Sequence, residues 1–202
     1  MKVLVACEYS GRVRDAFIAA GHDAISCDLL PTDAPGPHHQ GDVVEYIQSL
    51  AYDSLDLIIA HPPCTCLTVA GNSTYGRGMP KHDLRIKEAA WTEDLWRLAK
   101  RKANRVCFEN PVGVLSTMTN IPKPVFVHPW QFGHKEQKKT GLHLHNLPKL
   151  VPTDIVYEEM MKLPKNQRER LHYLPPSPDR WKIRSTTFQG IANAMANQWG
   201  LI

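Results

Sequence analysis

The sequence predicts an α/β protein built on a doubly wound, mostly parallel sheet. A strand, a polar turn, a helix and a second strand open the chain within residues 2–27. Short apolar runs then alternate with helical patterns as far as Phe108, an order typical of parallel βαβ units. Polar residues directly follow these runs, at the sheet edge where open α/β folds bind ligands.

Length and composition limit the class of protein. The chain has 202 residues, 43% of them hydrophobic and 22% charged, which indicates one globular domain rather than a disordered or fibrous chain. No apolar run approaches the roughly 20 residues that span a bilayer, and the first run ends at Glu8, too early for a secretory signal. Five cysteines without a framework pattern fit reduced thiols. We therefore expect a cytoplasmic protein with no membrane partner.

Apolar periodicity and turn residues predict the elements of the first half. In order, these are a strand at 2–7, a helix at 12–20, a strand at 23–27, a loop at 31–41, a helix at 42–50 and a strand at 56–60. Gly21 is placed to end the first helix. The sequence His61-Pro62-Pro63 stops the strand abruptly and opens a glycine-rich loop to about residue 80.

The second half begins with the strongest helical pattern and then becomes rich in proline. Asp83 can cap a helix at 83–101, and a strand is predicted at 105–108. Beyond Pro111, prolines interrupt every stretch. The remaining predicted elements are strands at 125–131 and 140–145 and a helix at 187–199.

Acidic residues follow the first strands at positions suited to a nucleoside. The segment Cys7 to Gly11 follows the first strand, Asp28 the second, and Asp42 stands after Gly41. Carboxylates there can accept hydrogen bonds from ribose hydroxyls and an adenine amino group. The same residues can equally be turn formers and helix caps, and taken alone Asp42 is better explained as a cap.

A cysteine and a glutamate follow the next two strands. Cys64 comes after a double proline, so we expect a rigidly held thiol with mobile chain beyond it to close over a substrate. A free cysteine has a pKa of about 8.5, so a nucleophile there needs help towards the thiolate. Glu109 emerges from an apolar run, and partial burial would raise its pKa and keep it able to donate a proton. A buried inert thiol and a structural acid are the alternatives.

These segments together resemble the cytosine-5 DNA methyltransferase family, which uses S-adenosylmethionine. Residues 62–64, with Thr68 and Gly71, are similar to its Pro-Cys loop, residues 108–110 to its Glu-Asn motif, and residues 41–43 to its Gly-Asp-Val motif. The motifs occur in family order, and residues 184–196 are similar to the end of short forms common in phage and prophage genomes. The resemblance implies a Rossmann-like methyltransferase fold.

The resemblance also implies roles for individual residues. Cys64 would add to carbon 6 of cytosine, and Glu109 would protonate or hydrogen-bond ring nitrogen 3. The nearest match to the family's arginine motif is residues 137–141, where Lys139 is the expected substitute. The cofactor S-adenosylmethionine would be held by Glu8, Ser10, Gly11, Asp28, Asp42, Pro62 and Asn193.

The chain departs from the family in having no room for a target-recognition domain. We expect a single methyltransferase-like domain over residues 1–202, with residues 146–186 as a short, basic, proline-rich insertion in its place. The expected reaction is methyl transfer to cytosine in DNA, at a short site or on single strands, with a protein partner or as a homodimer. The alternatives are the same chemistry on a free deoxycytidine nucleotide, and a noncatalytic module that binds S-adenosylmethionine or nucleic acid.

Charge and histidine content add two weaker indications. The net charge is +4, and the lysine and arginine clusters lie mostly in the last third, which fits either a solvated face or a polyanionic partner. His128, His134, His143 and His145 could in principle bind a metal, but no cysteine or carboxylate completes a recognisable ligand spacing. The sequence therefore predicts no metal site.

Overall fold

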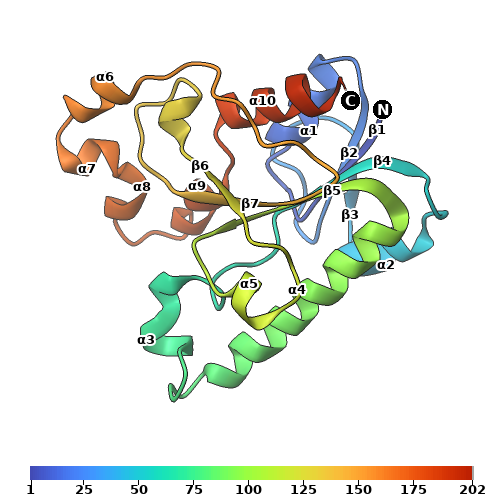
Figure 1. Ribbon diagram of the computed structural model, residues 1–202, viewed down its shortest axis with the longest axis horizontal. Coiled ribbons are helices and arrows are strands. Elements are labelled where there is room, and N and C mark those ends of the chain that lie inside the picture. Colours follow the sequence, from blue (N-terminus) through green and yellow to red (C-terminus); the bar gives the residue numbers. More distant parts are fainter. Residues whose placement is uncertain (202) are drawn as a thin grey trace.

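The computed structural model describes residues 1–201, and seven strands form a single sheet in the order β3-β2-β1-β4-β5-β7-β6 (Figure 1). Five strands run parallel: β1 (Lys2–Ala6), β2 (Asp23–Asp28), β3 (His38–Gln40), β4 (Leu55–Ala60) and β5 (Ala103–Pro111). The exception is β7 (Thr140–His145), which is antiparallel to both β5 and β6 (Val125–Val127). The predicted class, a doubly wound and mostly parallel α/β sheet, is confirmed.

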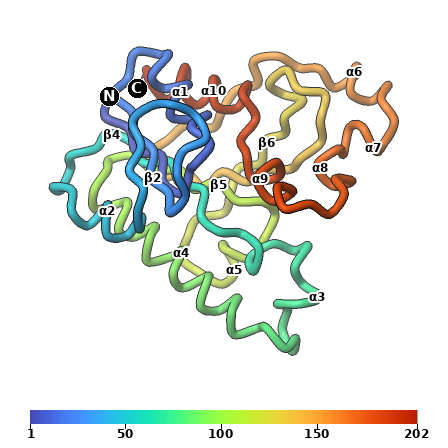
Figure 2. Tube along the Cα trace, turned by 180° about the vertical axis from the view of Figure 1, so that it is seen from behind, coloured from blue at the N-terminus to red at the C-terminus, as the bar shows by residue number. Residues whose placement is uncertain are grey.

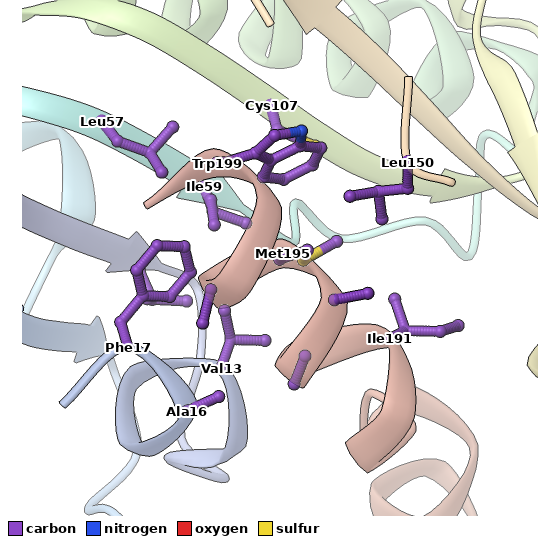
Figure 3. Close-up of a cluster of buried hydrophobic side chains, with 14 of the residues drawn as sticks. Val13, Ala16, Phe17, Leu57, Ile59, Cys107, Leu150, Ile191, Met195 and Trp199 are labelled. Atoms are coloured by element: carbon purple, nitrogen blue, oxygen red, sulfur yellow. The ribbon is translucent and has the colours of Figure 1, made fainter. Parts of the chain in front are cut away.

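Helices cover both faces of the sheet. On one face, α1 (Arg12–Ala19) packs against α10 (Gln189–Trp199), and the opposite face carries α2 (Val43–Ser49) and the long α4 (His82–Lys102) (Figure 1). Figure 3 shows the first of these layers, in which α10 lies beside α1 on the sheet and buries Ile191, Met195 and Trp199.

The two buried clusters divide the strand residues by alternation. Leu57 and Ile59 of β4 and Cys107 of β5 face α1 and α10, whereas Ile58 of β4 and Phe108 of β5 face α4. Successive side chains of a strand point to opposite faces of the sheet. The same alternation therefore shows which face each later residue of β5 points to.

Several predicted boundaries are corrected by the structure. The strand β3 lies inside the predicted loop at 31–41, because its polar sequence pairs only with β2 and carries no apolar signal. The predicted glycine-rich loop contains the short helices η1 (Val69–Gly71) and α3 (Asn72–Tyr75). The predicted strand at 125–131 is cut short at β6, and η2 (Pro129–Gln131) follows it.

Short helices fill the proline-rich regions. After β5 comes α5 (Leu115–Met118), and four more helices lie between β7 and α10: α6 (Tyr157–Met161), α7 (Lys165–Arg168), α8 (Arg170–Tyr173) and α9 (Arg180–Ser185). Figure 2 shows these four beside β6, on the side of the molecule away from β2. Among residues 1–201, no helix combines the length and apolarity needed to cross a membrane.

Candidate active site

The ends of β4 and β5 bring two predicted segments together. Ala60 of β4 is in register with Phe108 of β5, so the next residues, His61 just after the end of β4 and Glu109 within β5, lie side by side. Nδ1 of His61 lies 3.2 Å from Oε2 of Glu109. Cys64 follows three residues later and is partly exposed.

The pairing reverses the expected behaviour of Glu109. Burial alone would raise the pKa of this carboxyl, but the hydrogen bond from His61 and the charges of Lys138 and His61 outweigh burial and lower it. For His61, burial lowers the pKa, but the Glu109 hydrogen bond and charge, with the charge of Glu8, raise it above its ordinary value. The expectation of a raised Glu109 pKa is therefore wrong, because burial came with a basic partner.

The charges of Glu109 and Lys138 also act on the thiol of Cys64. Burial and the Glu109 carboxylate raise the pKa of Cys64, and the positive charges of Lys138 and Arg184 act in the opposite direction. The net effect favours the thiol in the free protein. Lys138 and Arg184 are therefore the residues that supply the help towards thiolate expected from the sequence.

Two neighbouring lysines point to different surroundings. Nζ of Lys139 lies 4.2 Å from the centre of the Phe126 ring, whereas Nζ of Lys138 donates a hydrogen bond of 2.9 Å to the Arg184 carbonyl. Lys138, rather than the predicted Lys139, is the lysine whose charge acts on Cys64 and Glu109. Sequence reasoning also missed His61, although its position directly before Pro62 was a usable signal.

Close packing explains why glycine stands at 141, the last residue of the segment 137–141. A Cβ at Gly141 would lie 2.9 Å from the Asn110 carbonyl oxygen and 3.0 Å from Cβ of Pro124. Both distances are too short for a side chain in the present backbone. An arginine therefore has no room at position 141 in this backbone.

The chain after Cys64 is anchored instead of free. Its first turn is closed by hydrogen bonds from the amides of Leu67 and Thr68 to the Cys64 carbonyl. Arg85 of α4 is buried and donates to the carbonyls of Cys66 at 2.6 Å and Thr68 at 3.0 Å. The expected mobile loop is therefore tied to α4 at its start, because a buried guanidinium satisfies its carbonyls.

The turn after β1 uses its polar groups locally. The carboxylate of Glu8 accepts hydrogen bonds from the amides of Val13 at 2.8 Å and Arg14 at 3.2 Å, and Ser10 Oγ donates to it at 3.2 Å. Gly11 adopts φ +73°, the left-handed conformation that starts α1. Glu8 and Ser10 therefore build the helix N-terminus, with their hydrogen bonds committed to it.

Asp28, at the end of β2, and Asp42, which follows β3, each keep one carboxylate oxygen that accepts no hydrogen bond in the described chain. Asp42 caps α2, its Oδ1 accepting from the amides of Val44 and Glu45 at 2.8 and 3.0 Å, and Asp28 Oδ1 accepts from Leu30 at 2.9 Å. Across residues 1–201, the Oδ2 atoms of both acids accept no hydrogen bond. Burial and, after it, their charges raise the pKa of Cys7, the residue that follows β1.

The remaining two predicted cofactor residues, Pro62 and Asn193, differ in burial. Pro62 is buried directly after His61. Asn193 is exposed on α10, where its side-chain oxygen accepts a 2.9 Å hydrogen bond from Gln189. No contact in the described part of the chain joins Asn193 to the acids at the strand ends.

The insertion reaches back to the first turn. The hydroxyl of Tyr9 donates to the Lys182 carbonyl at 3.1 Å and lies 3.2 Å from Ser185 Oγ. The rings of Tyr9 and Trp181 are 5.5 Å apart, and Lys182 forms a 3.5 Å ion pair with Asp33. Helix α9 is thereby held beside the strand end where the cofactor is expected. No cluster of three or more potential metal ligands occurs among residues 1–201.

Comparison with known proteins gives matches at the level of structure only. No protein-family model and no curated protein matches the sequence. Three solved structures are similar over most of this chain. A proposed DNA modification methyltransferase encoded within an E. coli prophage has 12% identity and a TM-score of 0.43 over 82% of this chain and 56% of its own.

The other two are also methyltransferases by name. The Entamoeba histolytica methyltransferase EhMeth has 13% identity and a TM-score of 0.49, with 77% of this chain and 57% of its own covered. A Spodoptera frugiperda DNMT2 variant has 14% identity and a TM-score of 0.42, with 76% and 54% covered. The chain thus spans little more than half the length of each, and its function is inferred from its own side chains.

Proposed function

We propose that this chain is an S-adenosylmethionine-dependent enzyme that methylates carbon 5 of cytosine in DNA. The proposal depends chiefly on one observation: a carboxylate–imidazole pair lies where β4 ends beside β5, and Cys64 follows three residues later, within range of the Glu109 charge. This is the combination that addition to a pyrimidine ring requires, namely a nucleophile for carbon 6 and a proton donor for the ring nitrogen.

The residues at the neighbouring strand ends fit the cofactor in part. The free oxygens of Asp28 and Asp42 suit the ribose hydroxyls and the adenine amino group, and Pro62 adds an apolar wall. Glu8, Ser10 and Gly11 would shape the turn at this site, while Asn193 remains the least supported member of the set. When bound, S-adenosylmethionine supplies an electrophilic methyl group.

Cys64 would begin the reaction. Its thiolate forms a bond from Sγ to carbon 6 of cytosine, and the displaced electron pair makes carbon 5 nucleophilic. Burial and the Glu109 charge raise the pKa of the Cys64 thiol, and the charges of Lys138 and Arg184 favour this step because they oppose that rise. The 2.9 Å hydrogen bond between Lys138 and the Arg184 carbonyl keeps the two residues together.

The His61–Glu109 pair would hold the proton that this addition needs. As electron density builds on nitrogen 3, Glu109 donates a proton to it, and His61 passes its own proton from Nδ1 to the Glu109 carboxylate. After methylation, a solvent water molecule takes the proton from carbon 5, its electron pair re-forms the double bond between carbons 5 and 6, and the bond from carbon 6 to sulfur breaks so that Cys64 departs as thiolate. The proton on nitrogen 3 returns to the pair, which restores its starting state.

The insertion between β7 and α10 supplies the best surface for DNA. Trp181 and Tyr173 are about half exposed, at 49% and 50%, and Lys182 and Arg184 lie in the same short helix as Trp181. Aromatic rings among cations suit stacking of unpaired bases and contact with phosphates. The surface is small, so we propose short sites or single strands as substrate, with a protein partner or a second copy adding surface where a duplex must be opened.

A free deoxycytidine nucleotide is the second candidate substrate. The four helices of the insertion have only four to six residues each, and a mononucleotide needs neither a groove reader nor base flipping. Transfer of tritiated methyl groups to single-stranded DNA, duplex DNA and deoxycytidine monophosphate separates the two. We expect label in DNA, foremost in single strands. Label only in the mononucleotide contradicts the DNA proposal, and binding without transfer to any substrate contradicts an enzymatic role.

A further inference from the structure

A cavity of about 230 Å³ lies at the end of β5, away from the Cys64 site. Asn110 and Pro111 of β5, with His143 of β7, form one side of it, and α5 and the segment before β6 form the other. Phe108 and Asn110 alternate with Glu109 along the strand, so Asn110 faces the α4 side of the sheet and Glu109 the other. Neither Cys64 nor Glu109 lines the cavity.

Asn110 has no structural partner that explains its presence. Its side chain is 1% exposed, and neither Oδ1 nor Nδ2 has a hydrogen-bond partner in the described chain. A buried amide without a partner destabilises the folded state, since its hydration is lost without compensation. An amide in that condition that also lines a cavity is well placed to bind a polar ligand.

Further polar groups of the cavity wall are arranged around Asn110. Nδ1 of His143 lies 2.6 Å from the Pro122 carbonyl, so that nitrogen carries the hydrogen and Nε2 is left as an acceptor. Burial lowers the pKa of His143, which keeps the ring neutral. The wall therefore offers two acceptors, Asn110 Oδ1 and His143 Nε2, and one amide donor.

The apolar and charged groups of the wall suit a flat ring joined to an anion. Phe126 and Pro124 provide flat surfaces, and Lys123 adds a cation at the wall. The ammonium of Lys139 lies 4.2 Å from the centre of the Phe126 ring. An aromatic ring flanked by lysines is suited to stacking a base while its phosphate meets the cations.

We propose that this cavity binds the base of a single nucleotide that carries an exocyclic amino group, cytosine or adenine. The amino group would donate to Asn110 Oδ1 and His143 Nε2, and the adjacent ring nitrogen would accept from Asn110 Nδ2. Thymine presents an oxygen where these bases present the amino group, so it meets two acceptors and is disfavoured. The inference requires no methyl transfer, because it concerns binding at a separate place.

Equilibrium binding of radiolabelled dCMP, dAMP and TMP, without cofactor, tests the proposal. We expect dCMP or dAMP to bind about tenfold more tightly than TMP, and Asn110→Leu to remove that preference. Asn110→Leu should fold with an unchanged or higher Tm, because it exchanges an unpartnered amide for an apolar group of similar size. Asn104→Leu is the matched control, because Asn104 is an exposed asparagine of the same strand that does not line the cavity, and this variant should bind the nucleotides as the unaltered chain does.

The outcomes separate this cavity from the Cys64 site. Loss of binding in Glu109→Gln with binding retained in Asn110→Leu would assign the nucleotide to the catalytic site and overturn the proposal. Absence of binding by the unaltered chain, or equal binding of TMP, would also overturn it. Should Asn110→Leu fail to fold, Phe126→Leu at the partly exposed stacking surface replaces it as the test variant. We expect this variant to bind dCMP and dAMP more weakly. Unchanged binding would count against the cavity.

Discussion

Nδ1 of His61 lies 3.2 Å from Oε2 of Glu109, and this contact joins the carboxyl ends of two neighbouring parallel strands. The two side chains are mostly buried, with 10% and 14% of their surfaces exposed. Each side chain therefore depends on the opposite charge of the other to remain ionised while it is shielded from water. The pH responses of stability and of activity should both reflect this pair.

Stability should depend on pH through His61 and Glu109. The His61 pKa is raised above its ordinary 6.5, so its contribution is complete below pH 6.5 and is lost as pH rises through the folded value. The Glu109 pKa is lowered from 4.5, so its contribution is complete above pH 4.5 and is lost as pH falls through the folded value. The pair should stabilise most between these limits, as measured by urea unfolding across pH.

Removing the imidazole tests that dependence. His61→Asn should lower the free energy of unfolding near pH 5.5 by about 3 kcal/mol, because it leaves a buried carboxylate without its partner. The exposed His172, changed to Asn, is the control and should behave like the unaltered chain. Equal pH profiles for His61→Asn and the unaltered chain would show that the pair contributes nothing.

The nucleophile assignment predicts a complete loss of turnover in Cys64→Ser. A serine hydroxyl is far less acidic and less nucleophilic than a thiol, so it cannot add to carbon 6 at a useful rate. Covalent trapping by DNA containing 5-fluorocytosine, followed by a gel shift, reports the addition directly. Cys66→Ser is the matched control two residues away. Near-normal activity in Cys64→Ser, or equal loss in both variants, would refute the assignment.

Lys138 and Lys139 should differ when each is changed to Gln. The charge of Lys138 lowers the pKa of the Cys64 thiol, so Lys138→Gln should reduce the thiolate fraction, decrease the rate several-fold at neutral pH and move the pH–rate profile to higher pH. Lys139 contacts Phe126 instead, so its profile should stay in place. A shift produced by Lys139→Gln alone would return that lysine to the catalytic role expected from the sequence.

Asp42 has two separable roles that two substitutions distinguish. Asp42→Ser keeps a side-chain oxygen for the α2 N-terminus but removes the carboxylate, while Asp42→Ala removes both. We expect both variants to weaken S-adenosylmethionine binding, about tenfold, in calorimetric titration. Only Asp42→Ala should also lower the free energy of unfolding, by about 1 kcal/mol. An unchanged Kd in Asp42→Ser would leave Asp42 as a helix cap alone.

Arg85 should hold the chain that follows Cys64. Arg85→Met keeps the length of the side chain but leaves the carbonyls of Cys66 and Thr68 without their donor. We expect faster hydrogen exchange at the amides of Leu67 and Thr68, together with a lower kcat. Arg97→Met, on the exposed side of α4, is the control. Unchanged exchange in Arg85→Met would mean that the loop is held by other contacts.

The sequence was sufficient for the order of the elements, because local apolar periodicity alone indicates strands such as β1 and β4 and helices such as α4. It failed for β3, where His38 to Gln40 pair only at the sheet edge and show no apolar pattern. It also failed for Glu109, since burial alone predicts a raised pKa. The imidazole that lowers it lies 48 residues away in the chain.

The sequence by itself determined the fold class and the presence of nucleophilic and acidic residues at the strand ends, because both follow from local residue patterns. Only the tertiary structure decided which of these residues act on each other. Strand register sets His61 beside Glu109, and alternation turns Asn110 to the opposite face. The neighbouring lysines have different surroundings: Lys138 donates to the Arg184 carbonyl and its charge acts on Cys64, whereas Lys139 lies over the Phe126 ring. Such pairings join residues distant in the chain, so spacing along the sequence does not specify them.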